Sequence, residues 1–65
     1  MNSECIQVLR MAFIKNLSVL PEQSVNHLLH MESRDELIAL RDACLPDDKE
    51  ICDRITKEIG ELPND

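Results

Sequence analysis

Residues 33–46 read SRDELIALRDACLP, and this stretch predicts one complete helix with its start and its end. The pattern at its start is a capping box, in which the Ser33 hydroxyl accepts a hydrogen bond from the Glu36 amide and the Glu36 carboxylate reaches back to the serine amide. Apolar side chains follow at helical spacing, at Leu37, Leu40 and Cys44. Because Pro46 cannot continue a helix, we expect this one to cover residues 34–45.

Three further helices are predicted around this one. Apolar residues at three- and four-residue steps predict a helix over residues 3–20. Pro21, read as the first helical residue, predicts a second over residues 21–31. A last helix is predicted over residues 47–59 by the acids in its first turn, isoleucines four residues apart and a terminal Gly60.

Strand signals are almost absent, so we expect an all-α fold of three or four helices with short connections. The chain has 65 residues, which limits it to a single helical domain over residues 1–65. A core of that size supplies about 3–5 kcal/mol of stability. Because 43% of the residues are apolar, the chain is not a disordered acidic tail. Small domains of this kind often associate, which favours an interaction protein.

The first predicted helix is apolar over more than one face. Such a helix must be buried on more than one side, and a chain this short has little with which to cover it. We therefore predict a protein partner, and in particular a homodimer formed through this helix. A compact monomer, in which the later helices wrap the first, is the alternative. The predicted interface consists of Ile6, Leu9, Met11, Phe13, Ile14 and Leu17.

The net charge of −6 lies entirely in the second half of the chain. Residues 1–31 hold two acids and two bases, whereas residues 32–65 hold eleven acids and five bases. This half is expected to face water, which keeps a small protein soluble, or a basic partner. The predicted acidic face consists of Asp35, Asp42, Asp47, Asp48, Glu50 and Asp53.

The sequence argues against several kinds of site. The two middle helices resemble a helix-turn-helix in length, but the second of them has more acids than bases, so direct nucleic-acid binding is not expected. His27 and His30 share a helix face, yet no further ligand stands at a standard offset to complete a metal site. No glycine-rich phosphate loop or Gly-x-Ser-x-Gly turn is present. We therefore expect neither an enzyme nor a cofactor.

The cysteines and the apolar runs indicate the compartment. Three cysteines are an odd number, and none forms a Cys-x-x-Cys pair, which favours reduced thiols in a cytoplasmic protein. No apolar run approaches the roughly 20 residues of a membrane span. Residues 1–4 lead directly into an amphipathic pattern, so no secretory signal and no membrane association are expected.

The stretch from Ser33 to Pro63, which begins S-R-D-E-L and closes with E-L-P, resembles the second half of the Hha/YmoA family of small enterobacterial nucleoid-associated modulators. The resemblance implies an all-helical, acidic protein that modulates a transcription or nucleoid factor. Residues 44–47 differ from the family segment that contacts the nucleoid partner, so those contacts are not carried over. The matching positions are Ser33, Glu36, Leu37, Ala43, Glu50 and Pro63.

Two functions remain open at this point. The chain is either a regulatory or adaptor protein that binds another protein by an apolar helix face, or an acidic inhibitor or nucleic-acid mimic that occupies a basic groove of its target. The dependence of binding on salt distinguishes them, because screening weakens contacts between charges far more than apolar contacts.

Overall fold

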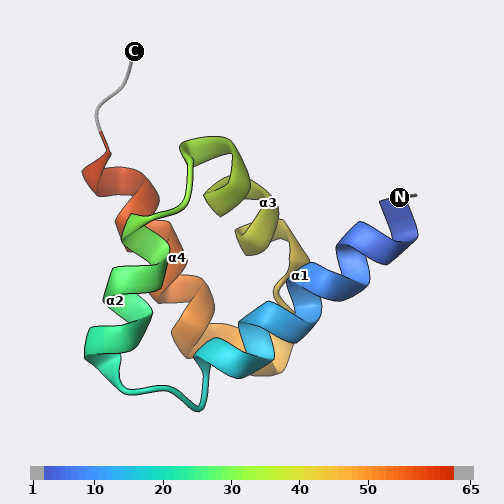
Figure 1. Ribbon diagram of the computed structural model, residues 1–65, viewed down its shortest axis with the longest axis horizontal. Helices are drawn as coiled ribbons and strands as arrows, with labels where there is room; N and C mark the ends of the chain where they lie inside the picture. Colours follow the sequence, from blue (N-terminus) through green and yellow to red (C-terminus); the bar gives the residue numbers. More distant parts are fainter. Residues whose placement is uncertain (1–2, 63–65) are drawn as a thin grey trace.

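The computed structural model describes residues 3–62, and this range contains four α-helices, a short 3-10 turn and no β-strand (Figure 1). The predicted all-α class is therefore confirmed. None of the helices in the described range is long and apolar enough to cross a membrane. The elements are α1 (Ser3–Leu17), α2 (Glu22–His30), α3 (Arg34–Ala43), η1 (Pro46–Asp48) and α4 (Lys49–Glu61).

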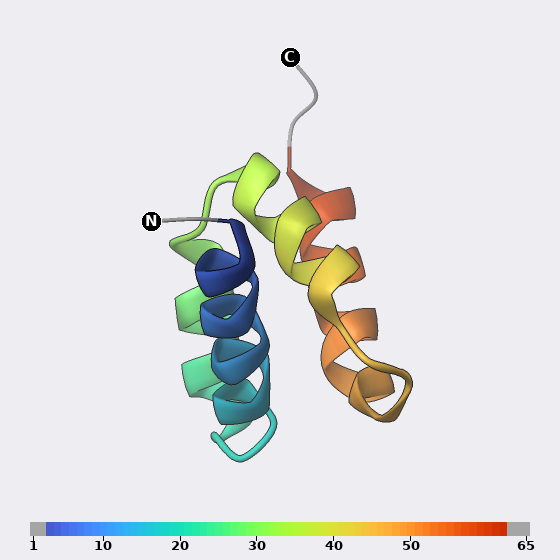
Figure 2. The same cartoon turned by 90° about the vertical axis from the view of Figure 1, so that its right-hand side faces the viewer.

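The helices form two layers, with α1 and α2 on one side and α3 and α4 on the other (Figure 2). Between the layers α1 packs on α3 and α2 packs on α4, while α3 and α4 pack together as an antiparallel hairpin. Every helix contributes its apolar stripe to the space between them, as the helical spacing predicts. The buried core consists of Ile14, Leu17, Val25, Leu29, Leu37, Leu40, Ala43, Ile51, Ile55 and Ile59.

The prolines determine where helices end. Leu45 has φ −92° and ψ 164° in front of Pro46, an extended geometry that a following proline favours. Extended residues therefore separate α3 from α4, which are two helices and not one kinked helix. Leu62 is likewise extended in front of Pro63. This restriction, and not Gly60, ends α4: the glycine lies inside the helix and has no positive φ.

Several predicted boundaries were wrong by two or three residues. The predicted helix over residues 3–20 ends at Leu17, because the chain needs residues 18–21 to reverse direction between α1 and α2. The Ser18 hydroxyl donates to the Lys15 carbonyl at 2.6 Å where this reversal begins. Pro21 is the N-cap of α2 and not its first helical residue, with φ −60° and ψ 152°.

The core is small, so we expect a single truncation in it to remove a large part of the stability. Ile55 is fully buried, and Ile55→Ala should lower the free energy of unfolding by about 2–5 kcal/mol, measured by urea denaturation. Val19→Ala is the control: its side chain is 81% exposed, and its effect should stay within about 0.5 kcal/mol. Equal effects of the two variants would contradict the assignment of the core.

Candidate functional site

The N-terminal half of α1 carries apolar side chains that the rest of the chain leaves open. Its first turns extend away from α2 and α4 (Figure 1). Val8 is 63% exposed and Leu9 58% exposed. Ile6, Leu9 and Phe13, together with Leu40 of α3, line a groove of about 250 Å³. We refer to Ile6, Leu9 and Phe13 as the α1 face; Val8 points to the other side of the helix.

The six residues of the predicted interface do not lie on one surface. Ile14 and Leu17 are buried in the core of the single chain and are not available to a partner, which corrects the prediction for both. Met11 and Phe13 are half-buried against that core. Ile6 is half-buried and Leu9 exposed, so the open part is confined to the N-terminal half of the helix.

Val8 was missing from the predicted interface, although its side chain is more exposed than that of Leu9. It precedes Leu17 by nine positions, which is two and a half helical turns at about 3.6 residues per turn. It therefore points away from the side of α1 that enters the core. This spacing was the signal that the sequence offered for finding it.

A charged pair forms one side of the groove. The Arg10 guanidinium donates from Nε to Glu36 Oε2 at 2.9 Å and from Nη2 to Glu36 Oε1 at 3.1 Å. This two-bond contact lowers the pKa of Glu36 and raises that of Arg10. The predicted capping box is thus only half formed: the Ser33 hydroxyl accepts from the Glu36 amide at 3.1 Å, but the carboxylate is bound to Arg10.

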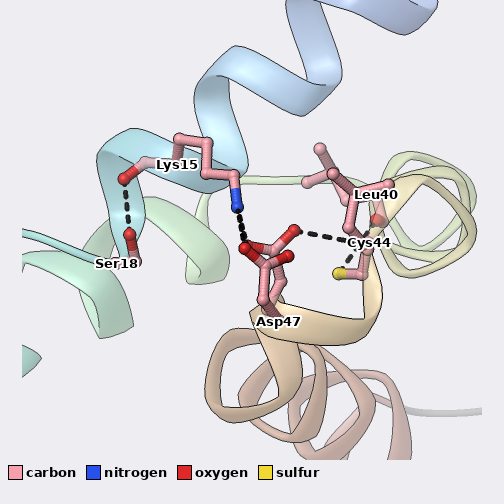
Figure 3. Close-up of polar contacts among 7 residues, drawn as sticks. Lys15, Ser18, Leu40, Cys44 and Asp47 are labelled. Atoms are coloured by element: carbon pink, nitrogen blue, oxygen red, sulfur yellow. Dashed lines mark hydrogen bonds and ion pairs between the residues drawn. The ribbon is translucent and has the colours of Figure 1, made fainter.

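Asp48 is the one buried charged residue within residues 3–62, with 6% of its surface exposed. Its carboxylate accepts from Lys15 Nζ at 2.7 Å and from the Leu45 amide at 2.9 Å. Asp47 also accepts from Lys15, at 3.1 Å (Figure 3). The hydrogen bond from Lys15, and then that from the Leu45 amide, lowers the pKa of Asp48, while Asp48 and Asp47 raise that of Lys15. The prediction that Asp48 belongs to a solvent-facing acidic surface was therefore wrong.

The other five acids of that predicted surface are exposed. Three of them are nevertheless paired with cations: Asp47 with Lys15, Asp53 with Lys49 at 2.9 Å, and Asp42 with Arg41 at 3.6 Å. Pairing of this kind reduces the negative potential that a basic groove would experience.

The histidines of α2 face α4 across a polar pocket. His30 Nδ1 lies 3.2 Å from Glu58 Oε1, and Arg54 and Lys57 line the same pocket. Arg54 Nε is buried there without a hydrogen-bond partner. Acids and bases both line this pocket, so its charge favours no particular ligand. No group of three or more histidine, cysteine or acidic side chains in the described part of the chain is arranged to hold a metal ion.

Cys44 lies at the turn between α3 and α4. Cys44 is the C-cap of α3, and its thiol donates to the Leu40 carbonyl at 3.5 Å (Figure 3). Burial, followed by the neighbouring Cys52 and by Asp48, raises the pKa of Cys44 to about 11. The thiol of Cys44 therefore stays protonated at neutral pH.

The chain matches no protein-family model, and neither a curated protein nor a solved structure shows significant similarity to it. The resemblance to the Hha/YmoA family accordingly stays a prediction.

The buried Asp48 should make the stability of the fold depend on pH in the acidic range. Because Lys15 and the Leu45 amide lower its pKa in the folded state, the unfolded chain binds its proton more readily, and stability is lost as the pH falls below about 4, the ordinary range of an aspartate. Urea midpoints measured across this range should fall steeply for the natural chain and less steeply for Asp48→Asn. Asp53→Asn, on the surface of α4, is the matched control and should keep the natural slope. An unchanged slope for Asp48→Asn would contradict this role of the carboxylate.

Proposed function

We propose that the chain is a small, non-enzymatic regulatory or adaptor protein that acts by binding another protein through the α1 face. The observation that carries this proposal is the exposure of Leu9 in the groove that it lines with Ile6, Phe13 and Leu40. Contiguous exposed apolar surface on a small domain is typical of interaction sites. Packing of an apolar helix face into a groove is one common way in which a partner binds such a surface.

A second copy of the chain is the partner that the charges favour. Helix α1 holds one acid and two bases, whereas α2, α3 and α4 each hold more acids than bases. Two copies, each with a net charge of −6, therefore repel least when they meet through α1. The Arg10–Glu36 pair beside the groove is neutralised within the chain and does not oppose an apolar contact.

The area that a dimer interface needs can be compared with the accessible surface of the chain. A specific dimer buries about 800 Å² on each partner. That is about one sixth of the 4733 Å² of accessible surface of the chain. The α1 face and the adjoining wall of α3 would form the centre of such an interface.

The alternative, an acidic inhibitor or nucleic-acid mimic, has less support. Of the six predicted acids, Asp48 is buried, and three others form ion pairs within the chain. Direct binding of nucleic acid is not part of the proposal, because a net charge of −6 opposes contact with phosphates.

The cellular role is also proposed. The resemblance of residues 33–63 to the Hha/YmoA family suggests modulation of a transcription or nucleoid factor. The odd number of cysteines, all of them thiols, suggests the cytoplasm as the compartment.

Leu9→Glu should disrupt the dimer. The substitution places a carboxylate in the apolar contact, and we expect the dissociation constant measured by analytical ultracentrifugation to rise at least about tenfold. Leu9 is 58% exposed and glutamate is a good helix former, so the folded chain should tolerate the change. Val19→Glu is the matched control: it adds the same charge to an exposed apolar residue outside the α1 face and should leave the dimer intact.

Analytical ultracentrifugation at several salt concentrations tests the alternative, in which charges drive the binding. An apolar interface should change little in affinity as sodium chloride is raised, whereas a charge-driven complex should weaken steeply. A dimer with a binding free energy of about −5.5 kcal/mol has a Kd of about 100 μM. If the chain still sediments as a monomer of 7.5 kDa at that concentration, a second copy is ruled out as the partner.

A further inference from the structure

The groove beside α1 contains one charged side chain that the chain itself does not neutralise. Glu32, which lies between α2 and α3, lines this groove together with the residues of the α1 face. Glu32 is half-buried, and within residues 3–62 its carboxylate has neither a hydrogen-bond donor nor a cation as a partner. The other two charged residues of the groove, Arg10 and Glu36, neutralise each other through two hydrogen bonds. The groove therefore combines apolar walls with one uncompensated negative charge.

We propose that Glu32 is a specificity-determining residue of this groove: its carboxylate weakens the binding of an occupant that brings no free cation, and a second copy of the chain is such an occupant. This role rests on the proposed docking function of the α1 face, because Glu32 lines the surface that a second copy would cover. A contact that fills the groove takes the carboxylate out of water, and burial of a carboxylate without a cationic partner costs free energy.

The two bases that the α1 helix of a second copy brings to this contact are already engaged within their own chain. Arg10 Nε and Nη2 donate to the Glu36 carboxylate at 2.9 and 3.1 Å. Lys15 Nζ donates to Asp48 at 2.7 Å and to Asp47 at 3.1 Å. If either base turned to Glu32 of the other copy, it would leave its own acid unpaired, so the contact would gain no net ion pair.

The adjoining helix α3 also brings no free base. Arg34 Nη1 donates to the Ile59 carbonyl of α4 at 3.5 Å, and Arg41 Nε lies 3.6 Å from Asp42 Oδ1. The bases of α4 are not among the residues that line the groove. Glu32 of each copy would therefore stay unpaired in a dimer formed through α1.

The groove thus distinguishes between occupants by a penalty. An unpaired charge at a contact disfavours one partner relative to another, and the penalty is removed for a partner that supplies a lysine or arginine at that place. Charged residues are depleted at the centre of protein interfaces for the same reason. The self-association of the natural chain should accordingly be weaker than its apolar surface alone would allow.

The test removes the carboxylate and measures self-association by analytical ultracentrifugation. Glu32→Gln keeps the size of the side chain and removes its charge, so the Kd of the dimer should fall about tenfold relative to the natural chain. Glu32→Ala removes the same charge without adding an amide and should shift the Kd in the same direction. Urea denaturation checks that both variants fold, as we expect, because the Glu32 amide and not its side chain bonds to the Leu29 carbonyl, at 3.1 Å.

Glu22→Gln is the matched control. It removes the same charge from an exposed residue of α2 that does not line the groove. At about 0.15 M salt, charges that lie far from the contact are largely screened, so the Kd should change less than about twofold.

The possible results separate the role of Glu32 from the docking function. A dimer whose Kd is the same in the natural chain and in Glu32→Gln would overturn the role of Glu32 alone. A weaker dimer in Glu32→Gln would do the same, because it would mean that a cation of the other copy reaches the carboxylate. If the natural chain and both Glu32 variants are all monomers at about 100 μM, the role of Glu32 and the second copy as partner are overturned together.

Discussion

The ion pair between Lys15 and the buried Asp48 sets the geometry of this domain. A buried carboxylate is costly unless its oxygens are bound, and here Lys15 and the Leu45 amide bind both of them. The contact attaches the C-terminal half of α1 to the turn that begins α4, and it brings Ile14 and Leu17 into the core. Because α1 is held at that end, its N-terminal half continues past the other helices (Figure 1). The Arg10–Glu36 pair holds the middle of α1 to α3, and most of the side chains before it are exposed.

The exposed apolar side chains of α1 and the distribution of charge are both consistent with the proposed association through this helix. Helix α1 is the helix with more bases than acids, while α2, α3 and α4 each hold one more acid than base. In the proposed dimer, contact through α1 would therefore meet the least charge repulsion. Like charges would penalise the other possible contacts between two copies.

The features that could be predicted from the sequence are those that depend on residues close together in the chain. Proline restriction, the Ser33 cap and the helical spacing of Leu37, Leu40 and Ile55 are local, and they predicted the all-α class and most of the core. The ion pairs were not predictable in this way, because Arg10 and Glu36 are 26 residues apart and Lys15 and Asp48 are 33 apart. The burial of Asp48 likewise exists only once the helices have packed. The width of the apolar stripe on α1 was visible, but which part of it the chain covers was decided by tertiary structure.

Helix α1 passes through two environments along its 15 residues. Its last two turns are fixed by Ile14, Leu17 and the ion pair, so their amide hydrogens should exchange with solvent only when the whole domain opens. Its first turns have few tertiary contacts, and fraying alone would expose their amides. One continuous helix would thus show a gradient of protection from end to end, and a partner bound at the frayed end would flatten that gradient.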